Sequence, residues 1–166
     1  LNSSFALTPE LGALPVSTFP FLGPGVRLSF DGDEGWYGLL GLFDGVPVDP
    51  NKARGTRVAI DEHEGGLTAV EGGYAPGDDL KIALGGWLRT TRSDFLTYEI
   101  YRRNSGAYLL GQFPFLSEGR VTGFFQLSVA EQDRNPIGHY FSAGLVCSEP
   151  FPGRTEDRLM AGVNRA

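Results

Sequence analysis

The most regular alternation of polar and apolar residues lies between positions 119 and 130. The polar residues of this stretch share one parity: Arg120, Thr122, Gln126 and Ser128. The apolar residues share the other: Val121, Phe125, Leu127 and Val129. Successive side chains of an extended chain point to opposite sides, so each set would occupy one face. Such alternation over about ten residues is typical of a strand with lipid on one face and water on the other.

The same reasoning divides most of the chain into strand segments. Strands are expected at 26–31, 35–44, 67–74, 79–90, 105–113, 119–130, 137–148 and 156–165, after a mostly loop-like stretch at 1–25. In 67–74, Glu71 is expected to face water. In 79–90, Lys81, Trp87 and Arg89 share one face, opposite a face of Leu80, Ile82, Leu84 and Leu88. Both faces of 35–44 are apolar, so the pattern does not orient that strand.

The connectors between these segments mostly alternate in length. DGDE, APGD and PFLSEG are short, whereas 45–66 and 91–104 are long, and the alternation weakens at EQDRNP and EPFPGRTE. Outer-membrane barrels have short periplasmic turns and longer outside loops. The pattern therefore favours a single all-β segment over 1–166, with DGDE, APGD, PFLSEG and EPFPGRTE on the periplasmic side.

Composition changes this picture little, but it excludes several classes of protein. The 24 glycines and the low charged fraction of 20% favour a β protein with many turns. Transmembrane helices need about 18 consecutive apolar residues, and the chain has no such run. A net charge of -6 argues against a nucleic-acid partner. A lone cysteine, Cys147, cannot form an internal disulfide.

No arrangement of residues indicates catalysis. The chain contains no G-x-S-x-G, P-loop or G-x-G-x-x-G motif. His63 lies in the acidic stretch DEHEGG, whose spacing matches no calcium loop, and a solvated loop tip is the better reading. We therefore expect no enzyme activity, catalytic residue, cofactor or metal.

An ordered set of short motifs resembles the carbohydrate-selective porins of the OprB type. The strongest part of the resemblance lies near the C-terminus: DRNP at 133–136, GLV at 144–146, and PGR at 152–154 followed by Asp157. Weaker matches follow the family's order: LNSSF at the start, PGVRL at 24–28, GLFDG at 41–45, GTR at 55–57, DEHEGG at 61–66 and LGGW at 84–87. Cys147 and Ser148 depart from the pattern, because the family usually has aromatic or polar residues there.

The resemblance implies an antiparallel up-and-down transmembrane β-barrel in the outer membrane of a Gram-negative bacterium. Members of the family have about sixteen strands and a polar lumen. This chain would supply about eight, as a middle part of the larger barrel. The implied function is passive, selective diffusion of carbohydrates. The implied partners are small sugars, outer-membrane lipid and the remaining strands, in a monomer or a homotrimer.

A sugar pathway needs polar groups that pair with hydroxyls and rings that meet the CH faces of a pyranose. The polar face of the expected strands, with one residue of a long loop, supplies these pore-lining candidates: Arg27, Arg57, Glu71, Lys81, Trp87, Arg89, Tyr108, Gln112, Arg120, Gln126 and Arg158. The strongest candidates are Trp87 with Arg89, followed by Arg57 and Glu71.

One alternative function remains open at this point. A soluble β-barrel or sandwich that binds a small ligand or a protein partner would also show alternating strands, with its aromatic rings in the core. The two differ in where the large apolar side chains lie, because a porin exposes them and a soluble barrel buries them.

Overall fold

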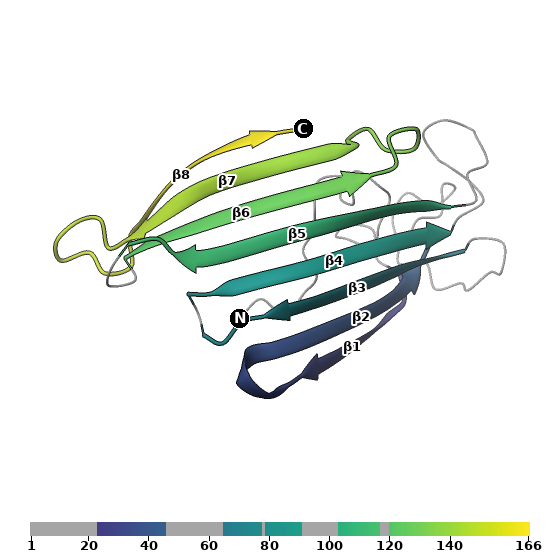
Figure 1. Cartoon of the computed structure of the whole chain (residues 1–166), viewed down its shortest axis with the longest axis horizontal. Helices are drawn as coiled ribbons and strands as arrows, with labels where there is room; N and C mark the ends of the chain where they lie inside the picture. Colours follow the sequence, from purple (N-terminus) through teal and green to yellow (C-terminus); the bar gives the residue numbers. More distant parts are fainter. Residues whose placement is uncertain (1–22, 46–64, 78, 91–102, 117–119) are drawn as a thin grey trace.

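The described residues of the computed structural model form one antiparallel sheet with its strands in chain order (Figure 1). The structure describes residues 23–45, 65–77, 79–90, 103–116 and 120–166. The strands are β1 (Gly25–Asp31), β2 (Trp36–Asp44), β3 (Gly66–Tyr74), β4 (Lys81–Thr90), β5 (Asn104–Pro114), β6 (Val121–Ala130), β7 (His139–Ser148) and β8 (Arg158–Arg165). A short 3-10 turn, η1 (Asp33–Gly35), joins β1 to β2.

The predicted all-β, up-and-down antiparallel fold is confirmed. Each of the eight strands overlaps one of the expected segments, and no strand end differs from its expected position by more than two residues. Within the ranges described, no helix has the length and apolar character needed to cross a bilayer. The expected loop at 1–22 lies outside the described residues.

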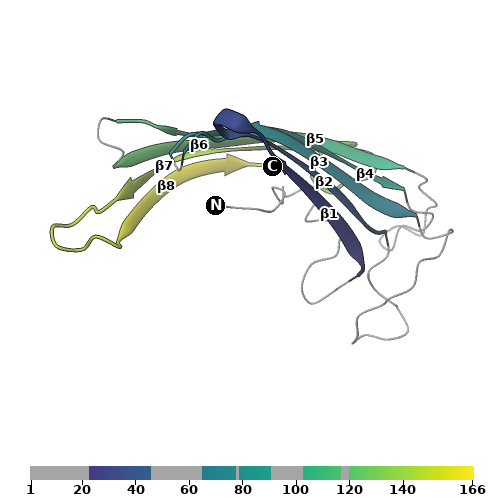
Figure 2. The same ribbon diagram turned by 90° about the horizontal axis from the view of Figure 1, so that it is seen from below.

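The sheet is bent into an arch, with β1 and β8 at its two ends (Figure 2). The strand order runs from β1 to β8 without closing, so the described strands form an open, curved wall. One edge of this wall carries the starts of β3, β5 and β7 and the ends of β2, β4 and β6. We call it the loop edge, because the two longest connectors, 45–65 and 91–103, leave from it.

The cross-strand register places residues of opposite parity on two chemically different faces. We call one the apolar face; its exposed side chains include Val26, Leu28, Phe30, Leu40, Leu42, Val70, Ile82, Leu84, Leu127, Val129, Phe141, Leu145, Leu159 and Val163. We call the other the polar face; it carries Arg27, Asp31, Tyr37, Glu71, Lys81, Arg89, Asn104, Tyr108, Gln112, Gln126, Ser128, Ser142, Arg158 and Asn164.

The two faces differ in exposure as well as in chemistry. On the apolar face, Phe30 is 69% exposed and Leu84 is 64% exposed. On the polar face, Glu71 and Arg89 are each 4% exposed. Side chains on the inside of an arch converge, whereas those on the outside spread apart, so the burial pattern assigns the polar face to the concave side (Figure 2).

The orientation of β2 follows from its neighbours, since its own sequence does not reveal it. Pairing of Phe43 with Leu67 places both on the polar face, where Leu67, Ala69 and Trp87 form a small buried apolar cluster against which Phe43 packs. The concave side is therefore not uniformly polar. Part of it, near the loop edge, is a closed apolar contact among β2, β3 and β4.

Aromatic rings lie across glycines of the adjacent strand at seven cross-strand pairs. On the polar face the pairs are Phe43 with Gly25, Tyr37 with Gly73, Tyr108 with Gly85, Trp87 with Gly106 and Phe124 with Gly144. On the apolar face they are Phe125 with Gly111 and Phe113 with Gly123. A Cβ atom at any of these glycines would lie 2.1–2.8 Å from the ring that covers it. The glycines therefore let the rings lie flat on the sheet.

Candidate functional site

A buried carboxylate lies near the middle of the polar face. Glu71 of β3 accepts hydrogen bonds from two tyrosine hydroxyls, that of Tyr37 on β2 at 2.8 Å and that of Tyr108 on β5 at 2.6 Å. Both rings reach it by lying over glycines, Gly73 and Gly85. Because the side chain of Glu71 has no exposed surface, its two oxygens are satisfied from within the protein. This residue therefore connects β2, β3 and β5 on the polar face.

Lys81 is the part of this cluster that solvent reaches. Its Nζ atom lies 3.9 Å from Oε1 of Glu71 and 5.2 Å from the centre of the Tyr37 ring. A quarter of the Lys81 side chain is exposed. The ammonium group offsets the buried negative charge and also meets the ring face, which attracts cations. Its remaining donors are on the concave side of the sheet.

Arg89 and Trp87 stabilise the wall closer to the loop edge. Nη2 of Arg89 donates a hydrogen bond to the carbonyl oxygen of Gly45, just after β2, at 3.0 Å. Trp87 is 4% exposed and packs in the cluster with Leu67 and Ala69. The arginine thus connects the end of β4 to the end of β2, and the indole ring has little surface left for a ligand.

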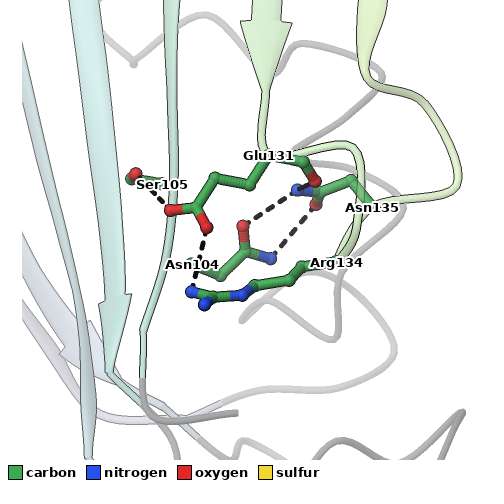
Figure 3. A network of polar contacts seen from close by, with 5 residues as sticks. All are labelled: Asn104, Ser105, Glu131, Arg134 and Asn135. Atoms are coloured by element: carbon green, nitrogen blue, oxygen red, sulfur yellow. Dashed lines mark hydrogen bonds and ion pairs between the residues drawn. The ribbon is translucent and has the colours of Figure 1, made fainter.

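A polar network joins the connector between β6 and β7 to the start of β5 (Figure 3). The amides of Asn104 and Asn135 exchange two hydrogen bonds, of 3.2 and 2.8 Å, and each residue is 7% exposed. The carboxylate of Glu131 accepts a hydrogen bond from Ser105 at 2.9 Å and forms an ion pair with Arg134 at 2.9 Å. Residues far apart in the sequence are thereby held together at the loop edge.

This network gives the DRNP motif a structural role. Asn135 also donates to the backbone carbonyl of Glu131 at 2.9 Å, which closes the turn on itself. Leaving a buried amide without a partner costs about 1–3 kcal/mol of folding free energy. The hydrogen bonds between Asn135 and Asn104 therefore anchor the turn to β5. Arg134 is held at the same edge by its ion pair, with about a third of its side chain exposed.

Replacement of Asn104 by alanine is expected to release this turn. The change leaves the buried amide of Asn135 without its partner, which should favour the open turn by about 1–3 kcal/mol. Limited trypsin digestion reports the opening, because cleavage after Arg134 needs the turn to leave the sheet. The variant should be cut roughly tenfold faster, while Gln112→Ala, at the other end of β5, should be cut at the original rate. Equal rates for both variants would exclude the anchoring role.

The described sequence candidates all belong to the polar side of the wall, but they differ in accessibility. The exposed ones are Arg27, Arg120 and Arg158, and the half-buried ones are Lys81, Gln112 and Gln126. The buried ones are Glu71, Trp87, Arg89 and Tyr108. Arg57 lies outside the described residues, as does His63. Which of these residues a solute contacts stays a prediction.

Four residues of the polar side were missed in the sequence. Tyr37 lies on a strand whose orientation the pattern does not give, and Phe124 is an aromatic residue among polar ones of the same parity. Asn104 and Asn135 were assigned to connectors. The DRNP motif was a usable signal for Asn135, since a short motif of turn-forming residues often marks a side chain bonded to the backbone. Among the residues described, no group of three or more His, Cys, Asp or Glu could hold a metal ion.

Comparisons with known proteins agree with this geometry. A family model described as carbohydrate-selective porin, OprB family, matches residues 2–166. The fold is similar to that of OprB from Pseudomonas putida in its high-pH structure, with a TM-score of 0.70 and 17% sequence identity. The match covers 93% of this chain and 42% of that one, so this chain spans less than half the length of the solved structure. A search of curated proteins found no match.

Proposed function

This chain belongs to the carbohydrate-selective porin, OprB family, and on that premise we propose that it forms part of the wall of a sugar-conducting pore. The pore would lie in the outer membrane of a Gram-negative bacterium and let carbohydrates diffuse through it passively and selectively. The family consists of channels, in line with the expectation that the chain is not an enzyme.

The observation that supports this function best is the separation of side chains between the two faces of the arch. The convex face presents Leu28, Leu84 and Val163 with 60% or more of each side chain exposed. In water such a continuous apolar surface is costly, but in a bilayer it is the surface that contacts lipid. Strands of about 9–11 tilted residues suffice to cross the hydrocarbon core, and β4, β5, β6 and β7 have 10 or 11 residues each.

The open edges of the sheet support the proposal that further strands complete the barrel. Unpaired backbone N–H and C=O groups at β1 and β8 would each cost several kcal/mol in hydrocarbon. Pairing with additional strands removes this cost, and closed barrels are the β structures that span membranes. The solved structure from Pseudomonas putida is more than twice as long as the part matched by this chain.

The soluble alternative is not favoured by the same observations. A soluble barrel would direct its large apolar side chains inward, whereas here Phe30, Leu84 and Val163 of the apolar face are each more than 60% exposed. The buried groups on the concave side include a carboxylate and a guanidinium instead. This arrangement suits a protein whose outside is lipid and whose inside is water.

The accessible part of the polar face sets the expected contacts with a solute. Lys81 and Gln112 form a direct cross-strand pair, and Gln126 lies on the next strand. We propose these three, with Arg27, Arg120 and Arg158, as the residues that line the water-filled path. The buried candidates would not contact the solute but would fix the shape of the wall; they are Glu71, Trp87, Arg89 and Tyr108.

A liposome-swelling assay on the intact porin that contains this chain tests the function. Porin-containing vesicles placed in isosmotic glucose should swell much faster than protein-free vesicles, because glucose enters through the pore and water follows. Swelling should slow as the sugar lengthens from glucose to a tetrasaccharide, because side chains that narrow the lumen exclude larger solutes. Potassium chloride conductance of the same preparation verifies that the pore has inserted. Conducting pores that admit no glucose would contradict a sugar channel.

A further inference from the structure

The polar face of the wall is divided into a charged part and a neutral part. The charged side chains of β1 to β4 on this face are Arg27, Asp31, Glu71, Lys81 and Arg89. On β5 to β7, the described strand residues of this face carry no charge; apart from Leu110, Val146 and small residues, they bear hydroxyls, amides and rings: Asn104, Tyr108, Gln112, Thr122, Phe124, Gln126, Ser128, Tyr140 and Ser142. A sugar without charge has most to gain from the second part, because ionised groups there would bind water more strongly than a hydroxyl.

The neutral part contains an aromatic ring that lies flat on the wall. Phe124 of β6 is opposite Gly144 of β7, and a Cβ atom at Gly144 would lie 2.6 Å from Cζ of that ring. The same ring atom lies 3.5 Å from the Cβ position of Gly162 on β8. The ring of Phe124 therefore extends from β6 over β7 toward β8, where glycines leave room for it. Phe124 is half-buried, so one ring face rests on the backbone and the other is on the concave side.

Two glutamines of the same face are adjacent to Phe124 in the sheet. Gln112 of β5 is the direct cross-strand partner of Phe124 on the side away from Gly144. Gln126 is two residues further along β6, on the same face, and it is paired with Ser142 of β7. Both glutamines are half-buried. Neighbouring strands are about 4.8 Å apart, so the long side chains of the two glutamines start within two strand spacings of β7, the strand over which the ring lies.

We infer that Phe124, Gln112 and Gln126 form a sugar subsite on the wall of the pore. The CH face of a pyranose stacks on the Phe124 ring, and its equatorial hydroxyls pair with the glutamine amides. A primary amide suits this task, since it donates and accepts and a hydroxyl does the same. Trp87, the largest ring of the polar face, cannot take this role because it is 4% exposed. The inference rests on the proposed function.

The test is sugar block of single-channel potassium chloride current in planar bilayers, with the intact porin. Phe124→Leu keeps the apolar bulk but removes the flat ring, and it should weaken block by glucose about threefold to tenfold. Phe124→Tyr keeps the ring and should restore block. Phe125→Leu is the matched control, because that neighbouring ring also covers a glycine, Gly111, but lies on the apolar face. It should leave block unchanged.

A comparison of solutes separates stacking from a general loss of shape. Mannitol has a similar size and similar hydroxyls but no ring face, so Phe124→Leu should weaken glucose block and leave mannitol block unchanged. Gln112→Ala and Gln126→Ala should weaken block by both solutes. Equal loss in Phe124→Leu and Phe125→Leu, or unchanged glucose block in Phe124→Leu, would overturn the subsite while leaving the pore intact. Conducting wild-type channels with neither glucose block nor glucose flux would instead overturn the proposed function itself.

Discussion

Replacement of Glu71 by alanine is expected to lower the free energy of unfolding by about 3–5 kcal/mol, because it breaks a buried charge network. The hydroxyls of Tyr37 and Tyr108 would lose the acceptor that both use, and Lys81 would lose its ion pair with Glu71. Glu71→Gln keeps one carbonyl acceptor, so its loss should be about half as large. Urea-induced unfolding of the porin in lipid vesicles, followed by tryptophan fluorescence, measures these differences.

The matched control for this experiment is Asp31→Ala. Asp31 is an acidic residue of the same polar face, but it is exposed at the end of β1, and exposed charges contribute about 0–1 kcal/mol. Tyr108→Phe supplies a second comparison. The double variant Glu71→Ala/Tyr108→Phe tests whether the Tyr108 hydroxyl acts through Glu71. If it does, the double variant should lose clearly less free energy of unfolding than the two single variants lose together. A Glu71→Ala variant no less stable than Asp31→Ala would refute the buried network.

Replacement of Gly85 by alanine is expected to destabilise the wall by about 1–3 kcal/mol, because the added methyl group overpacks the site. Its Cβ would lie 2.1 Å from Cζ of Tyr108 and 2.3 Å from the hydroxyl oxygen. The ring must move, and its hydrogen bond to Glu71 is then lost. The same unfolding assay applies, and Gly85→Ala should lose its effect in a Tyr108→Ala background.

Gly72→Ala provides the control, since Gly72 is also a strand glycine. The nearest atom to its Cβ position is a backbone oxygen at 4.0 Å, so a methyl group fits. Alanine also loses less backbone freedom on folding than glycine, which should make this variant equal in stability or up to about 1 kcal/mol more stable. Equal destabilisation by Gly72→Ala and Gly85→Ala would mean that the ring contact is not the cause.

The pattern of alternation predicted the strands well because it depends only on local geometry. A strand that separates two environments must change polarity at every residue, and 119–130 does so almost without exception. The parity of Lys81 and Arg89 was therefore readable before any partner strand was known. For β2 this signal failed, since residues 36–44 are mostly apolar or glycine. Its pairing with β1 and β3 supplied the missing orientation.

The sequence predicted on which face of the sheet the candidate residues lie, but not which side chains each of them contacts. Glu71 was a good candidate because it interrupts an apolar strand, yet its carboxylate is enclosed by tyrosines from β2 and β5. The burial of Trp87 is likewise set by Leu67 and Ala69 of β3. Both outcomes depend on side chains 18 to 37 positions away in the sequence, which no local pattern contains.

The sequence by itself determined that this is an all-β chain with one polar and one apolar face, and its motifs indicated the porin family. The physical reason is that alternation and turn chemistry act over a few residues. Only the tertiary structure decided which polar groups are buried within the wall and which are exposed on its concave side. That division depends on the register between strands, because register decides which ring lies over which glycine.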